Sequence, residues 1–321
     1  MDQTKVKEFF LRTMLYLSPI LLMMLGMEIL QRKLPNDYSY KKQQLESKLG
    51  EIETLILGTS HTYMGINPSL FEGEAFNLAS TAQTLYFDRF LFEKYHKDMP
   101  KLKRLILPIS YSSLGSESYL NPGAFNKSYH FAYFYGSDAF IKKLAPRRFS
   151  LVSLFSVKRS VDRSLAYYRG EDDLVECDER GWYQGNEDPK ELERSGETTG
   201  ALHDQFYDEE LIPQNIQYVT DIIEACQAAD IDLYLLSTPM YKSYMDHVKE
   251  DRYQLMLTNL DAISSTYKVP YLNFTFDNTY KAQDFFDSNH LNEKGADMFT
   301  QNLIEQIKRL EAQKVMAADI R

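Results

Sequence analysis

The feature that most constrains the fold is a regular alternation between short apolar runs and longer amphipathic segments. Five runs rich in aliphatic and aromatic residues have the length of buried strands: residues 55–57, 75–78, 104–109, 232–236 and 271–274. Helical periodicity lies between or after them, in segments 85–95, 211–229, 253–267 and 292–313. Strands that alternate with helices are typical of a parallel sheet covered on both faces. The sequence therefore predicts an α/β fold with a five-stranded parallel sheet.

The N-terminus differs in kind, because residues 13–30 are apolar apart from Glu28. A helix of this length spans roughly 27 Å, enough for the hydrocarbon core of a bilayer. A signal peptide is one alternative, but no small-residue cleavage site follows the apolar run. A buried core helix is the other, and the lack of a polar face disfavours it. We therefore expect residues 1–30 to be a retained transmembrane anchor and residues 31–50 a polar stalk that ends in a short helix.

The side of the membrane is not decided by charge, because lysines and arginines flank both ends of the apolar run. A single N-terminal anchor before a large domain usually places that domain outside the cytoplasm. We accordingly expect an extracytoplasmic domain, in the periplasm or at the cell surface.

A long insertion interrupts the alternation at residues 111–210, and we interpret it as a lid. This leaves residues 51–110 and 211–314 as the main domain. The first part of the insertion is rich in aromatic residues, which we expect to form the core of the lid rather than a platform for sugars: Tyr111, Tyr119, Phe125, Tyr129, Phe131, Tyr133, Phe134 and Tyr135. The second part of the insertion is acidic, which is usual for solvated surface: Asp172, Asp173, Glu176, Asp178, Glu179, Glu187 and Asp188.

Charge and cysteine content exclude several classes of function. The formal charge of −10 provides no basic stripe for phosphates, so we expect no nucleic-acid partner. Cys177 and Cys226 are too few for a thiolate metal site, and they are either one bridge or, as we prefer, two unpaired thiols. The histidines outside the candidate site show no ligand spacing, so we expect no metal and no cofactor.

Two short motifs at opposite ends of the domain carry the chemistry. Ser60 ends the motif Gly-Thr-Ser directly after the first strand, and Asp287 precedes His290 by three residues on a turn that opens the last helix. Singly, Ser60 could be a helix cap and His290 a structural histidine. Loops after parallel strands converge at one edge of the sheet, however, and Ser80, Ser110 and Thr238 follow the other strands. We therefore predict a Ser60–His290–Asp287 triad for nucleophilic acyl chemistry.

These motifs resemble those of the SGNH/GDSL hydrolases, in which a nucleophilic serine follows the first strand and a late Asp-x-x-His supplies the base. The resemblance covers residues 50–313 without the insertion and implies a flavodoxin-like three-layer fold, ester chemistry and no metal. Two blocks depart from the family, because its second-block glycine falls near Ala79 or Ser80 and its third-block asparagine is absent around Ser110. We expect the backbone N–H groups of Ser60, Ala79 and Ser80, and the Ser110 side chain, to supply the oxyanion hole, with His61 as a pocket wall.

The anchor, the Gly-Thr-Ser-His motif and the lid are similar to a membrane-anchored SGNH-like branch. That branch works with polytopic membrane-bound O-acyltransferases in acylating bacterial envelope polymers. The resemblance implies acyl transfer, of O-acetyl or a similar group, to or from a cell-envelope or extracellular polysaccharide. A carbohydrate esterase and a catalytically silent glycan-binding scaffold are the alternatives.

Overall fold

The computed structural model describes residues 3–117, 127–128, 130–137, 157–171, 174–185 and 191–319. Its centre is a parallel sheet in the order β2-β1-β3-β4-β5. The strands are β1 (Ile52–Ile56), β2 (Glu74–Asn77), β3 (Arg104–Pro108), β4 (Asp232–Ser237) and β5 (Tyr271–Asn273). This is the flavodoxin-like strand order. The predicted α/β fold with a five-stranded parallel sheet is confirmed.

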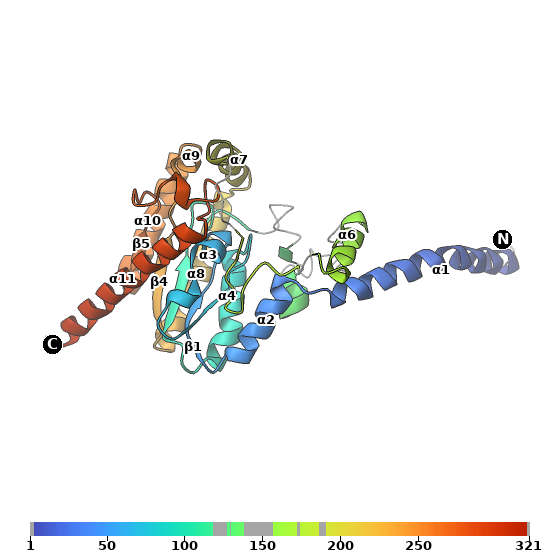
Figure 1. Ribbon diagram of the computed structural model, residues 1–321, viewed down its shortest axis with the longest axis horizontal. Coiled ribbons are helices and arrows are strands. Elements are labelled where there is room, and N and C mark those ends of the chain that lie inside the picture. The colour runs from blue at the N-terminus through green and yellow to red at the C-terminus, as the bar shows by residue number, and fades with distance from the viewer. Residues whose placement is uncertain are drawn as a thin grey trace.

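Helices cover both faces of the sheet (Figure 1). Their bounds are α1 (Gln3–Lys33), α2 (Asp37–Lys48), α3 (Ser60–Gly65), α4 (Leu85–Tyr95), α6 (Val157–Tyr168), α7 (Leu192–Gln205), α8 (Ile212–Ala228), α9 (Lys242–Met245), α10 (Glu250–Tyr267) and α11 (Glu293–Asp319). Short 3₁₀ turns lie at Pro68–Leu70, His96–Asp98, Glu209–Leu211 and Ala282–Asp284, and a π turn lies at Phe131–Tyr135.

Alternating side chains of the strands form two separate cores. Leu55 and Leu105 pack with apolar residues of α4, α8 and α10 on one face. Ile56 and Ile106 pack on the other face with residues of α11, including Phe299. This division follows from the two-residue period of a strand, which sends successive side chains to opposite faces. The two cores and the sheet make three layers.

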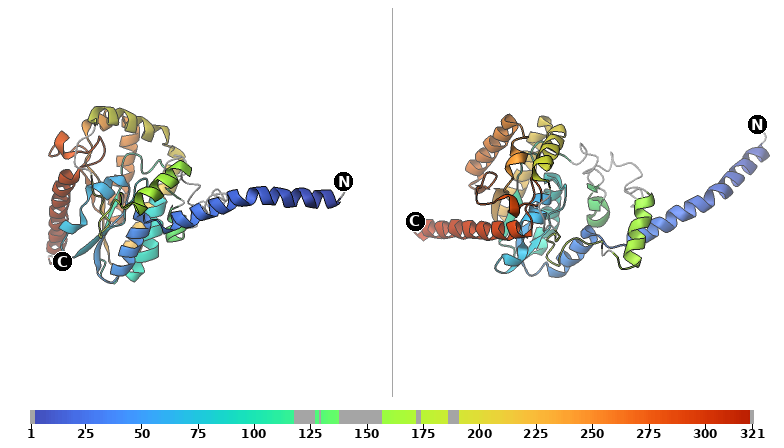
Figure 2. Two further views of the ribbon diagram at one scale, coloured as in Figure 1. Left: turned by 45° about the vertical axis from the view of Figure 1, so that its right-hand side comes forward. Right: turned by 45° about the horizontal axis from the view of Figure 1, so that its top comes forward.

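Helix α1 projects away from the rest of the chain in every view (Figures 1 and 2). Its apolar side chains are exposed, and it is long and apolar enough to cross a membrane. A membrane anchor and a signal sequence both have this character. The apolar N-terminal helix is therefore as predicted, and its retention remains a proposal.

Helix α2 differs from the polar stalk expected over residues 31–50. Its Leu45 is fully buried in the core. Lys41 is also buried, where its Nζ donates a hydrogen bond to the carbonyl of Ala79 at 2.5 Å and lies 3.6 Å from the ring centre of Tyr63. The lysine and glutamine content suggested solvation, but the aliphatic part of a lysine can be buried when its amine finds an acceptor. Residues 37–48 thus pack on the domain instead of spacing it from the membrane.

The inserted segment is only partly described. Phe131 and Tyr135 were expected to form the core of the lid, but they lie in the core of the main domain, where Phe131 stacks on Phe87 of α4 at 4.1 Å. Residues 174–185 run beside the outer edge of the sheet, because the Asn77 N–H donates to the carbonyl of Arg180 at 2.8 Å. Its acidic residues Glu176 and Glu179 are exposed, as expected of solvated surface, while the backbone of the same stretch covers an edge strand. Other aromatic and acidic positions lie outside the described residues: Tyr119, Phe125, Tyr129, Asp172, Asp173, Glu187 and Asp188. Cys177 and Cys226 are buried free thiols.

Candidate active site

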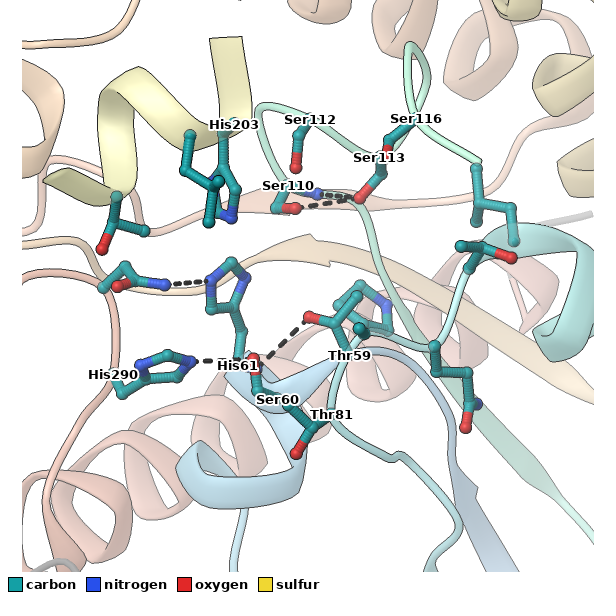
Figure 3. A pocket seen from close by; sticks show the side chains of 18 of the residues that line it. Thr59, Ser60, His61, Thr81, Ser110, Ser112, Ser113, Ser116, His203 and His290 are labelled. Atoms are coloured by element: carbon teal, nitrogen blue, oxygen red, sulfur yellow. Dashed lines mark hydrogen bonds between the residues drawn. The ribbon is translucent and has the colours of Figure 1, made fainter. Parts of the chain in front are cut away.

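A sharp turn after β1 presents Ser60. Gly58 has φ +114°, and a Cβ there would lie 2.0 Å from Pro108 Cγ, so the turn requires glycine. Thr59 is the N-cap of α3, and its Oγ1 accepts a hydrogen bond from the His61 N–H at 3.3 Å. Because Thr59 caps the helix, the Ser60 hydroxyl is not used as a cap. Figure 3 shows Ser60 at the floor of a pocket, beside Thr81 and His290.

The histidine and the carboxylate reach Ser60 from the turn before α11. The Nε2 of His290 lies 2.8 Å from the Ser60 Oγ, and its Nδ1 lies 2.8 Å from Asp287 Oδ1. The same Oδ1 accepts the backbone N–H groups of Asn289 at 3.1 Å and His290 at 2.9 Å. The carboxylate therefore shapes the turn and orients the ring. With its proton on Nδ1, His290 presents the Nε2 lone pair to the hydroxyl.

The electrostatics of Asp287 suit this arrangement. Burial opposes its ionisation, but the hydrogen bond from the His290 side chain, the charge of His290 and two backbone N–H groups outweigh burial and lower the pKa of the carboxyl. Asp287 is accordingly an anion at neutral pH. A fixed anion beside Nδ1 stabilises an imidazolium when Nε2 accepts a proton.

His61 lines the pocket but cannot substitute for His290. Burial, followed by the charges of His290 and His203, lowers its pKa well below the usual value. Its Nε2 lies 2.9 Å from the side-chain nitrogen of Asn289, and its ring centre lies 5.3 Å from that of His290. A neutral, buried ring held in this way forms a wall of the site.

Two predicted oxyanion donors are already occupied. The Ala79 N–H donates to Asn77 Oδ1 at 3.1 Å, and the Ser80 N–H donates to the Gly58 carbonyl at 3.1 Å. The expectation that they face an oxyanion is therefore corrected, because the loop after β2 uses both amides to hold itself against β1. Within the described part of the chain, the N–H groups of Ser60 and Thr81 have no hydrogen-bond partner, and both residues line the pocket.

Ser110 lies in the pocket as predicted, in a row of hydroxyl groups. Its Oγ lies 2.9 Å from Ser113 Oγ, and its N–H donates to the same oxygen at 2.8 Å. The cleft has a volume of about 260 Å³. Further hydroxyl groups line it, from Thr59, Thr81, Thr84, Ser112, Ser116 and Thr199.

His203 is a site residue that the sequence did not reveal. It comes from α7 in the insertion, and its ring enters the pocket from above (Figure 3). Its Nδ1 lies 2.8 Å from the hydroxyl of Tyr244, which is fully buried. Burial raises the pKa of Tyr244, so its O–H is intact and can donate to Nδ1. In the tautomer that accepts this hydrogen bond at Nδ1, Nε2 carries the ring proton. Burial, followed by the charge of His290, lowers the pKa of His203 to about 4, so the ring is neutral.

Asp88 is the second residue that was missed. This carboxyl is buried beneath the turn that follows β1, where its Oδ1 accepts the Gly58 N–H at 2.8 Å and the Gln83 side chain at 2.6 Å. Burial raises its pKa to about 7, and the hydrogen bonds oppose that rise. A lone aspartate on the apolar face of segment 85–95 was the available signal.

Comparisons with known proteins give the following similarities. A family model described as "Protein of unknown function (DUF1574)" matches residues 178–307. A solved structure from Bacteroides fragilis, described as a candidate acylhydrolase, is 13% identical with a TM-score of 0.41 and covers 84% of this chain and 93% of its own. A GDSL-like lipase from Bacteroides thetaiotaomicron is 12% identical with a TM-score of 0.40 and covers 86% of this chain and 100% of its own. No curated protein matches the chain.

Proposed function

We propose that the protein is a Ser-His-Asp acyltransferase that moves an acyl group, of acetyl size or similar, to or from a cell-envelope or extracellular polysaccharide. The observation that carries this proposal is the continuous chain of contacts from Ser60 through His290 to Asp287, at 2.8 Å for each link. Nucleophile, base and orienting anion in this order are the constellation required for an acyl-serine intermediate.

The reaction begins when Ser60 Oγ attacks the acyl carbonyl while its proton passes to Nε2 of His290. The backbone N–H groups of Ser60 and Thr81 are the donors we assign to the oxyanion, in place of those of Ala79 and Ser80. His290 then returns the proton to the departing oxygen, which leaves the acyl group as an ester on Ser60. Each such donor typically contributes about 2.7–4 kcal/mol to the transition state.

In the second half, an acceptor hydroxyl gives its proton to His290 Nε2 and attacks the acyl-serine. The new ester leaves, and the proton returns to Ser60. The hydroxyl row around Ser110 supports an acceptor that offers many hydroxyl groups of its own, because each can act as donor and acceptor. The described pocket residues include Asp88 and Asp287 but no lysine or arginine, which favours an uncharged sugar at this position.

His203 is the residue we assign to positioning of the acceptor. When Tyr244 donates to its Nδ1, the neutral ring carries its proton on Nε2, and this N–H can donate to a hydroxyl without competing for the proton that His290 moves. Thr199 and Leu202 of the same helix line the pocket beside His203, so α7 offers this N–H next to a hydroxyl and an apolar surface.

Membrane attachment through residues 13–30 belongs to the same proposal. An apolar, exposed helix of this length supports a retained anchor with the domain outside the cytoplasm. A polytopic membrane-bound O-acyltransferase is the partner we propose as acyl source, on the sequence resemblance alone.

The test is acyl transfer by the full chain in detergent, with an activated acetyl ester as donor and a neutral oligosaccharide as acceptor. We expect product that depends on the acceptor and is lost in Ser60→Ala. Thr59→Ser is the matched control, because it keeps a capping hydroxyl on the neighbouring residue and should remain active. Fast hydrolysis without acceptor would instead assign a carbohydrate esterase. A folded protein that binds glycan but forms no acyl-serine would contradict both enzymatic functions.

A further inference from the structure

We propose that α6 is an interfacial helix that rests on the bilayer surface beside α1, with Val161, Leu165 and Tyr168 against the lipid and basic side chains at the headgroups. The partner is therefore a membrane with anionic lipids. The inference rests on the proposal that α1 is a retained anchor, and it is independent of the acyl chemistry.

A buried polar contact fixes α6 at the end of the apolar helix. The side-chain nitrogen of Gln31 donates to the Ser160 carbonyl and to the Ser164 hydroxyl, at 2.9 Å each. Gln31 directly follows the apolar stretch of residues 13–30, so this contact marks the level at which α1 would leave the hydrocarbon core. Both views of Figure 2, like Figure 1, show α6 beside the domain end of α1.

The direction of α6 follows from the same figures. In Figure 1 it runs across the axis of α1 rather than along it. Transmembrane helices tilt on average only about 20° from the bilayer normal. A helix that crosses the end of such a span therefore lies close to the plane of the membrane surface.

The faces of α6 are arranged for that position. At about 100° per residue, Arg163 lies on one side of the Ser160 and Ser164 face, and Val161, Leu165 and Tyr168 lie on the other. Arg163 faces the domain, because it lines a small cavity there with Leu34, Pro35, Asn36, His130 and Phe134. The apolar strip must then face away from the domain, which is the side on which α1 continues as an apolar helix.

Exposure and charge support lipid as the occupant. Leu165 is 45% exposed and Tyr168 is 59% exposed, so within the described structure the strip lacks a full apolar covering. Lys158 and Arg169 are exposed and border it on the side opposite the serines. Arg163 faces the domain, so Lys158 and Arg169 are the cations beside the strip, in a chain whose formal charge is −10. An apolar strip bordered by cations is typical of helices that bind anionic membrane surfaces.

Fluorescence quenching in proteoliposomes tests the inference on the full chain. Leu165→Cys carries the label in the strip, and Ala166→Cys is the matched control, because it lies on the adjacent residue but points away from the strip. The native thiols should not compete for the label, because Cys177 and Cys226 are buried. Burial also raises the pKa of the Cys177 thiol to about 12, which keeps it in the unreactive protonated form. The vesicles contain equal parts of phosphatidylcholine and phosphatidylglycerol and nitroxide lipids labelled at either end of the acyl chain.

We expect the label at 165 to lose most fluorescence with the nitroxide near the headgroup, since interfacial helices lie only about 5–10 Å into the bilayer. The label at residue 166 should lose little fluorescence with either nitroxide lipid. Equal quenching at the two positions, or none at 165, would overturn the inference and would point to a protein surface as the occupant. Replacing phosphatidylglycerol with phosphatidylcholine should reduce quenching at 165, and unchanged quenching would refute the role of the basic residues.

A label at Leu21→Cys separates this inference from the anchor proposal. Leu21 lies in the middle of residues 13–30 and should be quenched most by the nitroxide near the terminal methyl group. Quenching at 21 without quenching at 165 rejects the α6 inference alone. No quenching at 21 rejects the anchor and the α6 inference together, and acyl transfer by the same sample is unaffected by either outcome.

Discussion

Replacing Asp88 by asparagine should remove a pH dependence of stability that arises beneath the turn carrying Ser60. The perturbation is nearly isosteric, and the new amide oxygen can still accept the Gly58 N–H, which Asp88 Oδ1 accepts at 2.8 Å. Gln83 can reorient, because its Oε1 is buried without a hydrogen-bond partner and could accept from the new amide. Asp88→Asn should therefore keep the turn and acyl transfer while removing the titrating group.

The sign and size of this pH dependence of stability follow from the raised pKa of Asp88. The folded chain raises the pKa of Asp88 from 3.8 to about 7 through burial, so it holds this proton more tightly than the unfolded chain does. The stability from Asp88 is thus fully present below about pH 4 and is lost as the pH rises towards about 7. Three pKa units at about 1.4 kcal/mol each give ~4 kcal/mol overall, and between about pH 5.5 and about pH 7.5 the loss is ~2 kcal/mol.

The assay is denaturant unfolding of the full chain in detergent at these two pH values, for wild type and Asp88→Asn. We expect the mutant to gain about 2 kcal/mol relative to wild type as the pH rises. Asp221→Asn is the control. Burial raises the pKa of Asp221, but hydrogen bonds from Gln217 and Arg89 outweigh it and leave the pKa lowered, so the control should not alter the slope in this range. An identical pH dependence in wild type and Asp88→Asn, or a change of opposite sign, would refute the reasoning.

Three further predictions concern the site. Ser60→Ala and His290→Ala should each abolish acyl transfer, and the double mutant should be no slower than either, whereas independent factors that multiply would exclude a shared mechanism. Gly58→Ala should lower the melting temperature and the activity together, because the new Cβ meets Pro108 at a positive φ, and a wild-type melting curve would contradict the required turn. His203→Gln should raise the KM for the acceptor several-fold while the rate of acyl-serine formation is unchanged, and an equal loss in both steps would reject an acceptor role.

The sheet was predictable from sequence because its strands are buried on both faces and read as continuous apolar runs. The approach of Ser60 to His290 was predictable for a related reason. Parallel strands bring their carboxyl ends to one edge, so residues 230 positions apart could be expected to meet there, and they do at 2.8 Å.

The remaining parts of the site depend on contacts that no local pattern encodes. Ala79 and Ser80 were predicted as oxyanion donors from their place after β2. In the structure their N–H groups donate to Asn77 Oδ1 and the Gly58 carbonyl instead. His203 sits in an insertion without strand periodicity, and its position depends on how α7 packs on α9. The burial of Lys41 likewise needs the Ala79 carbonyl, 38 residues away in the chain.

The central claim is that Ser60 carries the acyl group, and the most direct test is mass spectrometry of the protein quenched in acid during turnover of an activated acetyl ester. The account predicts one added acetyl group, located by fragmentation at Ser60, absent in Ser60→Ala and removed when the oligosaccharide acceptor is supplied. Turnover without any adduct, or an adduct that persists in Ser60→Ala, would contradict it.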